Sequence, residues 1–261
     1  MVQSEQAPDA RPTPPRYALY YAPAVGSAWW RFGCSWLGRD AASGDVRVPP
    51  AMPALAGLDL LQLTAAPRRY GFHATLVAPF TLAPGVTPAQ LHQRIAELAR
   101  TLAPVPLGAL QPAQLEGFVA LLPQAAPPTA TSPNAASLIT ASTKAASSID
   151  ALARTCVLAL NPLRAILSPA EFARRTRGQD AHGVWLVQQH GYALVMDRFR
   201  FHMTLTGDVD AATAKRVVDA ACALVAPLNK AHPPLLDRLC LYVEPGAGTP
   251  WRRVADFELA R

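Results

Sequence analysis

Two short strings with the same side-chain chemistry stand far apart in this chain, His73-Ala74-Thr75-Leu76 and His202-Met203-Thr204-Leu205. An imidazole can give or take a proton near neutral pH, because its unperturbed pKa is about 6.5. Two imidazoles held together could therefore supply a base and an acid to one reaction. The repeated string predicts that His73 and His202 form such a catalytic pair, and it leaves open which of them is the acid.

Each string lies in a segment that is predicted to be a β-strand followed by a helix. Residues 198–206 alternate polar and apolar side chains, which is the pattern of a half-buried strand, and a similar alternation includes Arg69, His73 and Thr75 on one face. An amphipathic helix follows both times, with Thr87 as the predicted N-cap of the first and Asp208 or Asp210 of the second. Duplication of one strand–loop–helix unit explains these coincidences together.

Hydrolysis of a phosphodiester needs a base for water, an acid for the departing oxygen, and donors that hold the phosphoryl oxygens. Thr75 and Thr204 follow the histidines on the same predicted faces and could donate those hydrogen bonds. Arg69, Arg198 and Arg200 are candidate anion clamps, although each one taken singly is more often solvated or ion-paired. These residues favour acid–base chemistry on a small phosphorylated substrate.

Metal-dependent and nucleotide-dependent chemistry finds less support in the sequence. Each repeated string supplies one good metal ligand, and the chain has no His-x-x-x-His or His-x-x-Glu string beside them. It also has no P-loop, no Rossmann glycine pattern and no Gly-x-Ser-x-Gly string. We therefore expect neither a metal ion nor a cofactor in the reaction.

Length and composition set the broad class. The chain has 261 residues, 51% of them hydrophobic, and a formal net charge of +6. No apolar run approaches the roughly 20 residues that span a bilayer, and residues 1–15 are polar and proline-rich without a signal core. We expect a cytoplasmic protein with a disordered arm at residues 1–15 and no membrane partner. Its positive charge is scattered rather than clustered, so nucleic acid is a possible but not a favoured partner.

Predicted strands, helices and turns mix along the chain, which indicates an α+β fold with antiparallel sheets flanked by helices. Two such sheets facing a central cleft would bring the histidines together. Residues 124–148 interrupt the pattern, because they are almost wholly Ala, Ser, Thr and Pro. We expect this low-complexity insertion to be flexible, or to be helical only at its C-terminal end.

At these residues the chain resembles the two-histidine (2H) phosphoesterase superfamily, which is defined by two His-x-Thr/Ser-hydrophobic motifs in duplicated lobes. Five segments are similar to the bacterial branch associated with carbon–phosphorus lyase and phosphonate degradation: Arg16–Pro23, Trp36–Asp40, Arg69–Leu76, Leu167–Glu171 and Phe199–Gly207. One departure is Val77, which stands where the family pattern usually has a lysine.

The resemblance implies a bilobal duplicated 2H fold and a metal-independent hydrolase acting on a small cyclic phosphodiester in phosphonate catabolism. A five-membered cyclic ribose phosphate would be one such substrate. It implies a single bilobal domain at residues 16–261, with the first motif in residues 16–123, the second in residues 149–261, and strands that may exchange between the lobes. Tyr20, in the first matching segment, joins the candidates for binding the substrate phosphate.

Two other functions stay open from the sequence. The same chemistry could act on RNA ends or 2′,3′-cyclic nucleotides, which would call for a long basic groove. Alternatively, the protein could bind a phosphorylated ligand without turning it over. The oligomeric state is not predicted.

Overall fold

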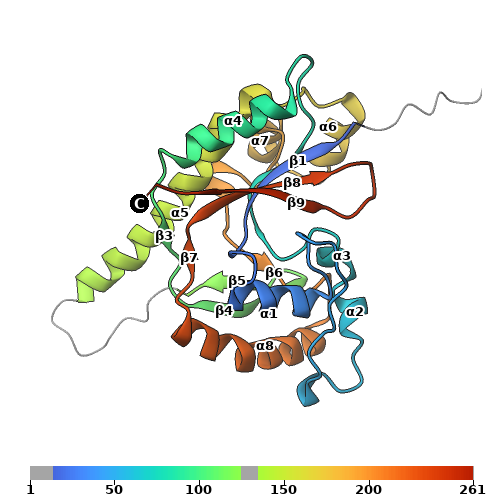
Figure 1. The fold of residues 1–261 in the computed structure, drawn as a ribbon, viewed down its shortest axis with the longest axis vertical. Coiled ribbons are helices and arrows are strands. Elements are labelled where there is room, and N and C mark those ends of the chain that lie inside the picture. Colours follow the sequence, from blue (N-terminus) through green and yellow to red (C-terminus); the bar gives the residue numbers. More distant parts are fainter. Residues whose placement is uncertain (1–13, 125–134, 261) are drawn as a thin grey trace, which may run out of the picture.

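The computed structural model describes residues 14–124 and 135–260 of the chain. Its helices and strands follow in this order: β1 (Arg16–Tyr21), α1 (Ala28–Leu37), η1 (Pro53–Leu55), α2 (Leu60–Leu63), α3 (Ala65–Arg68), β2 (Ala74–Phe80), α4 (Pro88–Ala99), β3 (Val105–Pro106), β4 (Leu110–Leu115), β5 (Phe118–Pro123), α5 (Ala135–Leu160), η2 (Asn161–Leu163), α6 (Pro169–Thr176), α7 (Ala181–His190), η3 (Met196–Arg198), β6 (Met203–Thr204), α8 (Ala211–Ala231), β7 (Leu235–Leu236), β8 (Arg238–Glu244) and β9 (Arg252–Glu258). Figure 1 shows helices above and below the strands.

The described strands form one large sheet and one small one. Seven strands lie in the order β4-β5-β6-β2-β1-β8-β9, and the paired neighbours run antiparallel. The remaining two, β3 and β7, pair with each other. The predicted α+β class with an antiparallel sheet and flanking helices is confirmed.

The expected pair of sheets facing a cleft is not what these strands form. Strands β2 and β6, which carry the two motifs, are neighbours in the large sheet because Ala74 pairs with Met203. The motifs are thus brought together by strand pairing within one sheet. The bilobal duplicated arrangement stays a prediction.

One face of the sheet packs against three long helices. Helix α8 lies on β4 and β5, α5 on β2, and α4 on β8 and β9 (Figure 1). Strand β2 buries alternate residues, from Ala74 to Phe80, in the main apolar core that these helices complete. Burial of this apolar surface is the dominant force that holds β2 and its histidine in place.

The other face of the sheet carries a second, smaller aromatic cluster. Tyr20 from β1, Tyr242 from β8 and Trp251 beside β9 pack there with Trp30 and Cys34 of α1. All five side chains are buried. This cluster packs against the start of β2, where the ring of Tyr20 stacks on that of His73.

Local sequence signals set several helix boundaries. Thr87 and Gln90 form a capping box at the start of α4, as the predicted N-cap at Thr87 requires. Of the two candidates after the second motif, Asp210 caps α8 by accepting from the backbone N–H of Thr213.

The predicted strand at residues 198–206 is much shorter in the structure. Only Met203 and Thr204 belong to a strand, and Met196–Arg198 form the 3₁₀ turn η3. The alternation of polar and apolar residues is that of a half-buried extended segment, but the pairing partners on β2 and β5 reach only these two residues. Arg198 and Arg200 therefore lie outside the strand.

Two predicted segments fall partly outside the described residues. Of the N-terminal arm, only Pro14 and Pro15 are described, and residues 125–134 of the low-complexity insertion are not. Helix α5 begins at Ala135, inside that insertion. Across the parts of the chain that are described, no helix has the length and apolar character to cross a membrane.

Candidate active site

The register between β2 and β6 joins the two motifs into one cluster. Ala74 and Met203 are antiparallel partners, so His73 lies opposite Thr204, and Thr75 lies opposite His202. Ala74 and Met203 are buried in the core, so the four polar side chains project from the other face. Directly opposite residues in such pairs have their Cβ atoms about 4.5–5.5 Å apart. Each histidine therefore faces the threonine of the other motif, around a local two-fold axis.

Both imidazoles are held in the same way. The Nδ1 atom of His73 lies 2.8 Å from the carbonyl oxygen of Gly71, and Nδ1 of His202 lies 2.8 Å from that of Arg200. A carbonyl oxygen only accepts hydrogen bonds, so each Nδ1 carries the hydrogen and each Nε2 is the atom left for chemistry. Thr75 Oγ1 lies 3.4 Å from Nε2 of His73.

His73 sits among aromatic rings. Its ring stacks on Tyr20 with 3.9 Å between centroids and 24° between planes, and Tyr70 and Tyr242 flank it at 6.1 Å. Burial lowers the pKa of His73 to about 4; the hydrogen bond to Gly71 opposes this shift and the nearby His202 adds to it. His73 is therefore neutral at pH 7.

We expect the imidazole of His73 to titrate with a midpoint near pH 4 in the folded protein. The unfolded chain binds this proton more tightly, at a pKa of about 6.5, so the stability contributed by neutral His73 is lost as the pH falls from about 6.5 toward 4. NMR titration of the ring protons, assigned with His73→Gln, measures the midpoint directly. A midpoint above 6 would contradict this account of the buried ring.

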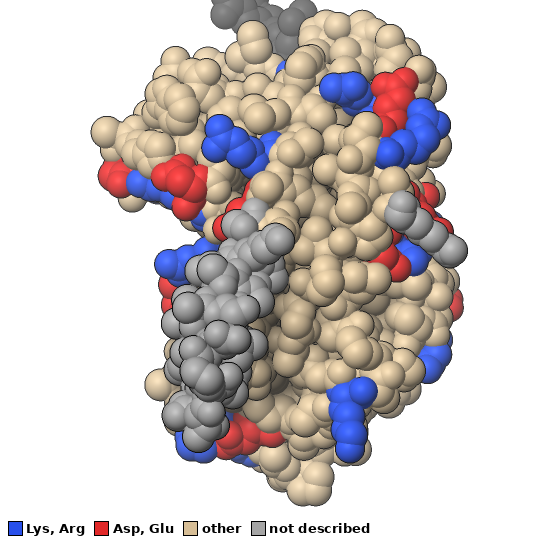
Figure 2. Space-filling view, turned by 90° about the vertical axis from the view of Figure 1, so that its left-hand side faces the viewer, with Lys and Arg blue, Asp and Glu red and all other residues tan. Residues whose placement is uncertain are grey.

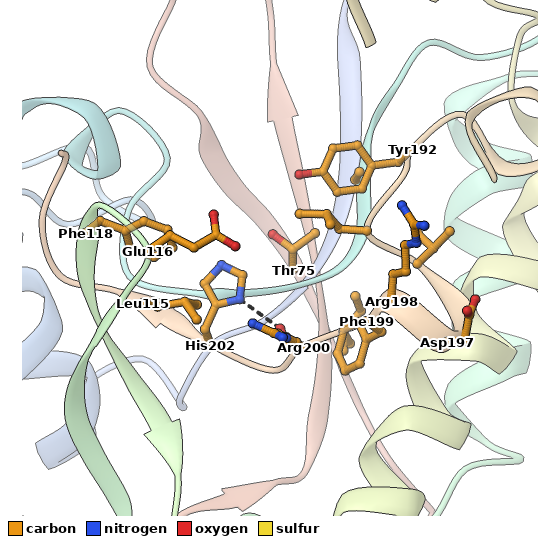
Figure 3. Close-up of a pocket in the computed structure, with 14 residues that line it drawn as sticks. Thr75, Leu115, Glu116, Phe118, Tyr192, Asp197, Arg198, Phe199, Arg200 and His202 are labelled. Atoms are coloured by element: carbon orange, nitrogen blue, oxygen red, sulfur yellow. Dashed lines mark hydrogen bonds between the residues drawn. The ribbon is translucent and has the colours of Figure 1, made fainter. Parts of the chain in front are cut away.

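Two adjoining cavities open over the four motif residues. The first, of about 490 Å³, is lined by Thr75 and His202, and the second, of about 430 Å³, by His73 and Thr204. They share Thr75, Ala78, Phe118 and Tyr192 as lining residues, so they form one depression across β2 and β6. Figure 3 shows Thr75, His202 and Tyr192 around the first cavity.

The three candidate arginines differ in whether they line a cavity and whether an acidic side chain pairs with them. Arg200 is exposed and lines the first cavity, and no acidic side chain in the described part of the chain pairs with it. Arg198 lines the same cavity but binds the Asp180 carboxylate at 2.6 Å. Arg69 lines neither cavity, because it caps the end of α3 rather than extending β2, and it pairs with buried Glu244.

Tyr20 and Val77 also have roles that the sequence did not indicate. Tyr20 is 1% exposed and lines the second cavity from beneath His73, through its ring. Val77 is half-buried and packs against the small cluster of Val157, Leu186 and Val195. An apolar contact thus occupies the position where the resemblance led us to expect a lysine.

The cavities also contain residues that sequence reasoning missed. Glu116, Phe118, Tyr192 and Phe199 line the first cavity beside His202 (Figure 3). Phe118 and Tyr192 are far apart in the sequence, and both line the two cavities because the fold brings their segments together. In the structure Glu116-Gly117 is the two-residue turn between β4 and β5, and no signal in the sequence placed it beside the histidines.

Within residues 14–124 and 135–260, no group of three or more His, Cys, Asp or Glu side chains is placed to hold a metal ion. These residues place two imidazoles, two hydroxyls and one guanidinium without an acidic partner around a depression, and Nε2 of His73 has Thr75 Oγ1 at 3.4 Å. Such a set can move protons and bind an anion.

The protein is thus of the α+β class, with an antiparallel sheet in which the two strands that follow His73 and His202 pair with each other. The chain belongs to the family described as "Protein of unknown function (DUF1045)", whose model matches residues 75–252. The match begins at Thr75 and includes the whole second motif.

Two curated relatives are similar over most of the chain. A protein of Laribacter hongkongensis (strain HLHK9) named "Ribose 1,5-bisphosphate phosphokinase PhnN" is 37% identical over 237 residues, which cover 91% of this chain and 50% of the relative. A protein of the same name from Janthinobacterium sp. (strain Marseille) is 34% identical over 246 residues, covering 92% and 50%. The chain therefore spans about half the length of the curated relatives it matches.

Proposed function

We propose that this protein is a phosphoesterase of the 2H type that hydrolyses a small cyclic phosphodiester by paired-histidine catalysis, without a metal ion. The observation that carries the proposal is the Ala74–Met203 pairing, which sets two histidines and two threonines on one face of the sheet. The matching Nδ1 contacts support it, because they turn both Nε2 atoms away from the backbone carbonyls, with Thr75 Oγ1 at 3.4 Å from that of His73.

The proposed reaction divides the proton transfers between the histidines. Neutral His73 takes a proton at Nε2 from a water molecule as the water oxygen bonds to phosphorus. His202, protonated, gives a proton from Nε2 to the ring oxygen of the substrate as its bond to phosphorus breaks. Thr75, Thr204 and Arg200 donate hydrogen bonds to the non-bridging oxygens, on which charge builds. The product is a phosphate monoester with a free hydroxyl, and the lowered pKa keeps His73 in the neutral form that a base must have before the reaction.

The relatives' printed name supports a phosphorylated sugar as the substrate class. Those proteins are named for action on ribose 1,5-bisphosphate, and they are about twice the length of the matching region. This chain has no Gly-Lys pair and hence no P-loop, so we do not assign a kinase reaction to it. A cyclic phosphate of ribose, met in phosphonate catabolism, fits both the site and the names. We also propose a cytoplasmic location, from the absence of an apolar spanning run in the sequence, and a bilobal domain from residue 16, from the resemblance to the 2H superfamily.

The rival substrate class, 2′,3′-cyclic nucleotides or RNA ends, has one observation in its favour. Phe118 and Phe199 line the first cavity and could stack on a base. Against RNA, Figure 2 shows Lys and Arg on the displayed face as separate patches, several of them beside Asp or Glu, rather than as a continuous basic track. We therefore favour the small sugar phosphate.

The test is hydrolysis of a panel of cyclic phosphates by the wild-type protein, with and without EDTA. We expect turnover of cyclic ribose phosphates above that of 2′,3′-cyclic nucleotides, with a bell-shaped pH dependence and no effect of the chelator. Activity that EDTA removes and added metal restores would rule out the proton-relay mechanism. Binding of cyclic phosphates without turnover of any of them would favour a ligand-binding protein.

A further inference from the structure

We propose that Glu116 recognises a hydroxyl group of the substrate's sugar, and that the cavity beside His202 is a sugar-binding subsite. This inference rests on the proposed function, and it names a part of the substrate that the reacting phosphate does not contact. Neither motif contains Glu116, which lies in the turn between β4 and β5.

The position of Glu116 places an unpaired carboxylate at the reaction site. It lines the 490 Å³ cavity together with His202, Thr75 and Arg200. Figure 3 shows its carboxylate above the His202 ring, on the side away from the hydrogen bond to Arg200. Across residues 14–124 and 135–260, no side chain forms a hydrogen bond or ion pair with this carboxylate, although its backbone oxygen accepts one from Gln114. Its acceptor atoms are thus available to a ligand.

The backbone at Glu116 gives a second and independent reason to assign it a role. Its φ is +55°, in the left-handed region that side chains other than Gly, Asn and Asp rarely adopt. In this Glu116-Gly117 turn the positive φ falls on Glu116 and not on Gly117, so the left-handed position is held by a residue that adopts it less readily than asparagine. Asparagine would therefore form the turn better than glutamate does. Strain of this kind is typical of functional positions, and what the glutamate adds here is a longer, charged side chain reaching into the cavity.

The chemistry of the ligand follows from the sign of the charge. A carboxylate accepts hydrogen bonds and repels a phosphate, so the group that Glu116 binds must be a hydrogen-bond donor without negative charge. The free hydroxyls of a sugar are such donors, and they are attached to the same ring as the reacting phosphate. Phe118, Tyr192 and Phe199 supply apolar surface for the ring itself, as small-molecule sites usually do.

The experiment compares Glu116→Gln and Glu116→Asn with the wild type, on ribose 1,2-cyclic phosphate and on its 3-deoxy analogue. Calorimetric binding of ribose 5-phosphate and 3-deoxyribose 5-phosphate gives a readout that does not depend on turnover. Glu97→Gln on α4, on the helix-covered face of the sheet, is the matched control. All four proteins are also compared by thermal unfolding and by the pH dependence of kcat/KM.

We expect the wild type to prefer the hydroxyl-bearing ligand by about tenfold or more, and both Glu116 variants to lose that preference while the control keeps it. Glu116→Asn should also melt about 2 °C higher, because it relieves the strained turn. An equal loss on both ligands with a shifted pH profile would instead mean that Glu116 acts through His202. Unchanged preference in the variants would overturn the proposal outright.

These readouts separate the two proposals. A preference in binding that Glu116 variants abolish, in a protein with no turnover, would retain the sugar subsite and reject the hydrolase. Turnover with no effect of Glu116 on the hydroxyl preference would retain the hydrolase and reject the sugar subsite.

Discussion

Replacing either His73 or His202 by alanine should reduce kcat for the cyclic phosphodiester by about 10²–10⁴-fold, with a small effect on KM. Each imidazole moves one proton in the transition state, and neither Thr75 nor Thr204 can replace it in that task at neutral pH. The double variant should lose little more than the more impaired single variant, because the two residues act on one transition state. Steady-state kinetics of the three variants measures this directly.

The matched control is His92→Ala, since His92 is an exposed residue of α4 that packs against Phe257. It should retain the activity of the wild type, and circular dichroism should show that all the variants are folded. Loss of activity in one histidine variant alone would contradict the paired mechanism, and would leave a single-base reaction in its place. The acid limb of the pH profile should disappear with whichever residue is the base, which we expect to be His73.

Strand β2 and the helices that follow the two motifs could be predicted because their signals are local. The alternation in β2, the capping box at Thr87 and the cap at Asp210 each depend on residues within a few positions of one another. The same signals could not reveal the pairing of Ala74 with Met203, which joins residues 129 positions apart (203 minus 74). The repeated motifs indicated that the histidines meet, while the register that makes each face the other's threonine is a property of the sheet.

The surroundings of Arg69 could not be predicted from the residues near it in the sequence. Arg69 has the residue type and spacing of a clamp, but the chain turns at α3 before β2 begins and carries it to Glu244, which no pattern near Arg69 indicates. Burial raises the pKa of Glu244, but the hydrogen bonds from Arg16 and Arg69 outweigh it and lower the pKa below its usual value. Arg69 therefore stabilises the fold at this carboxylate. Arg200, whose guanidinium has no such partner among the described residues, lines the cavity beside His202 and is the arginine that we propose for the phosphate.

The close approach of α1 to the first motif depends on a residue without a side chain. Gly33 lies in α1 against the ring of Phe72, the residue before His73, and a Cβ atom on Gly33 would come within 2.0 Å of that ring. Phe72 is fully buried and has Phe32 at 5.9 Å in an edge-on contact, so its ring has little room to move. The helix can therefore support the start of β2 only if position 33 is glycine.

Gly33→Ala should consequently destabilise the protein, although alanine favours helices by about 1 kcal/mol over glycine. Overpacking of a filled core costs about 1–3 kcal/mol, and a 2.0 Å approach to a fully buried ring calls for the upper end of that range. We expect a net loss of about 2 kcal/mol in the free energy of unfolding, or about 4–8 °C in melting temperature. Urea unfolding measures the first and a thermal melt the second.

Two further variants make this test specific for the contact. Gly246→Ala is the control, because its nearest neighbour is 3.8 Å away and its backbone is not in the left-handed region, so stability should change little. Adding Phe72→Leu to Gly33→Ala removes the clashing ring and should make the two substitutions less damaging together than the sum of each alone. Because Phe72 and His73 are adjacent, Gly33→Ala should also lower kcat at temperatures where the protein is still folded. A variant as stable and active as the wild type would show that α1 does not hold the start of β2 in place.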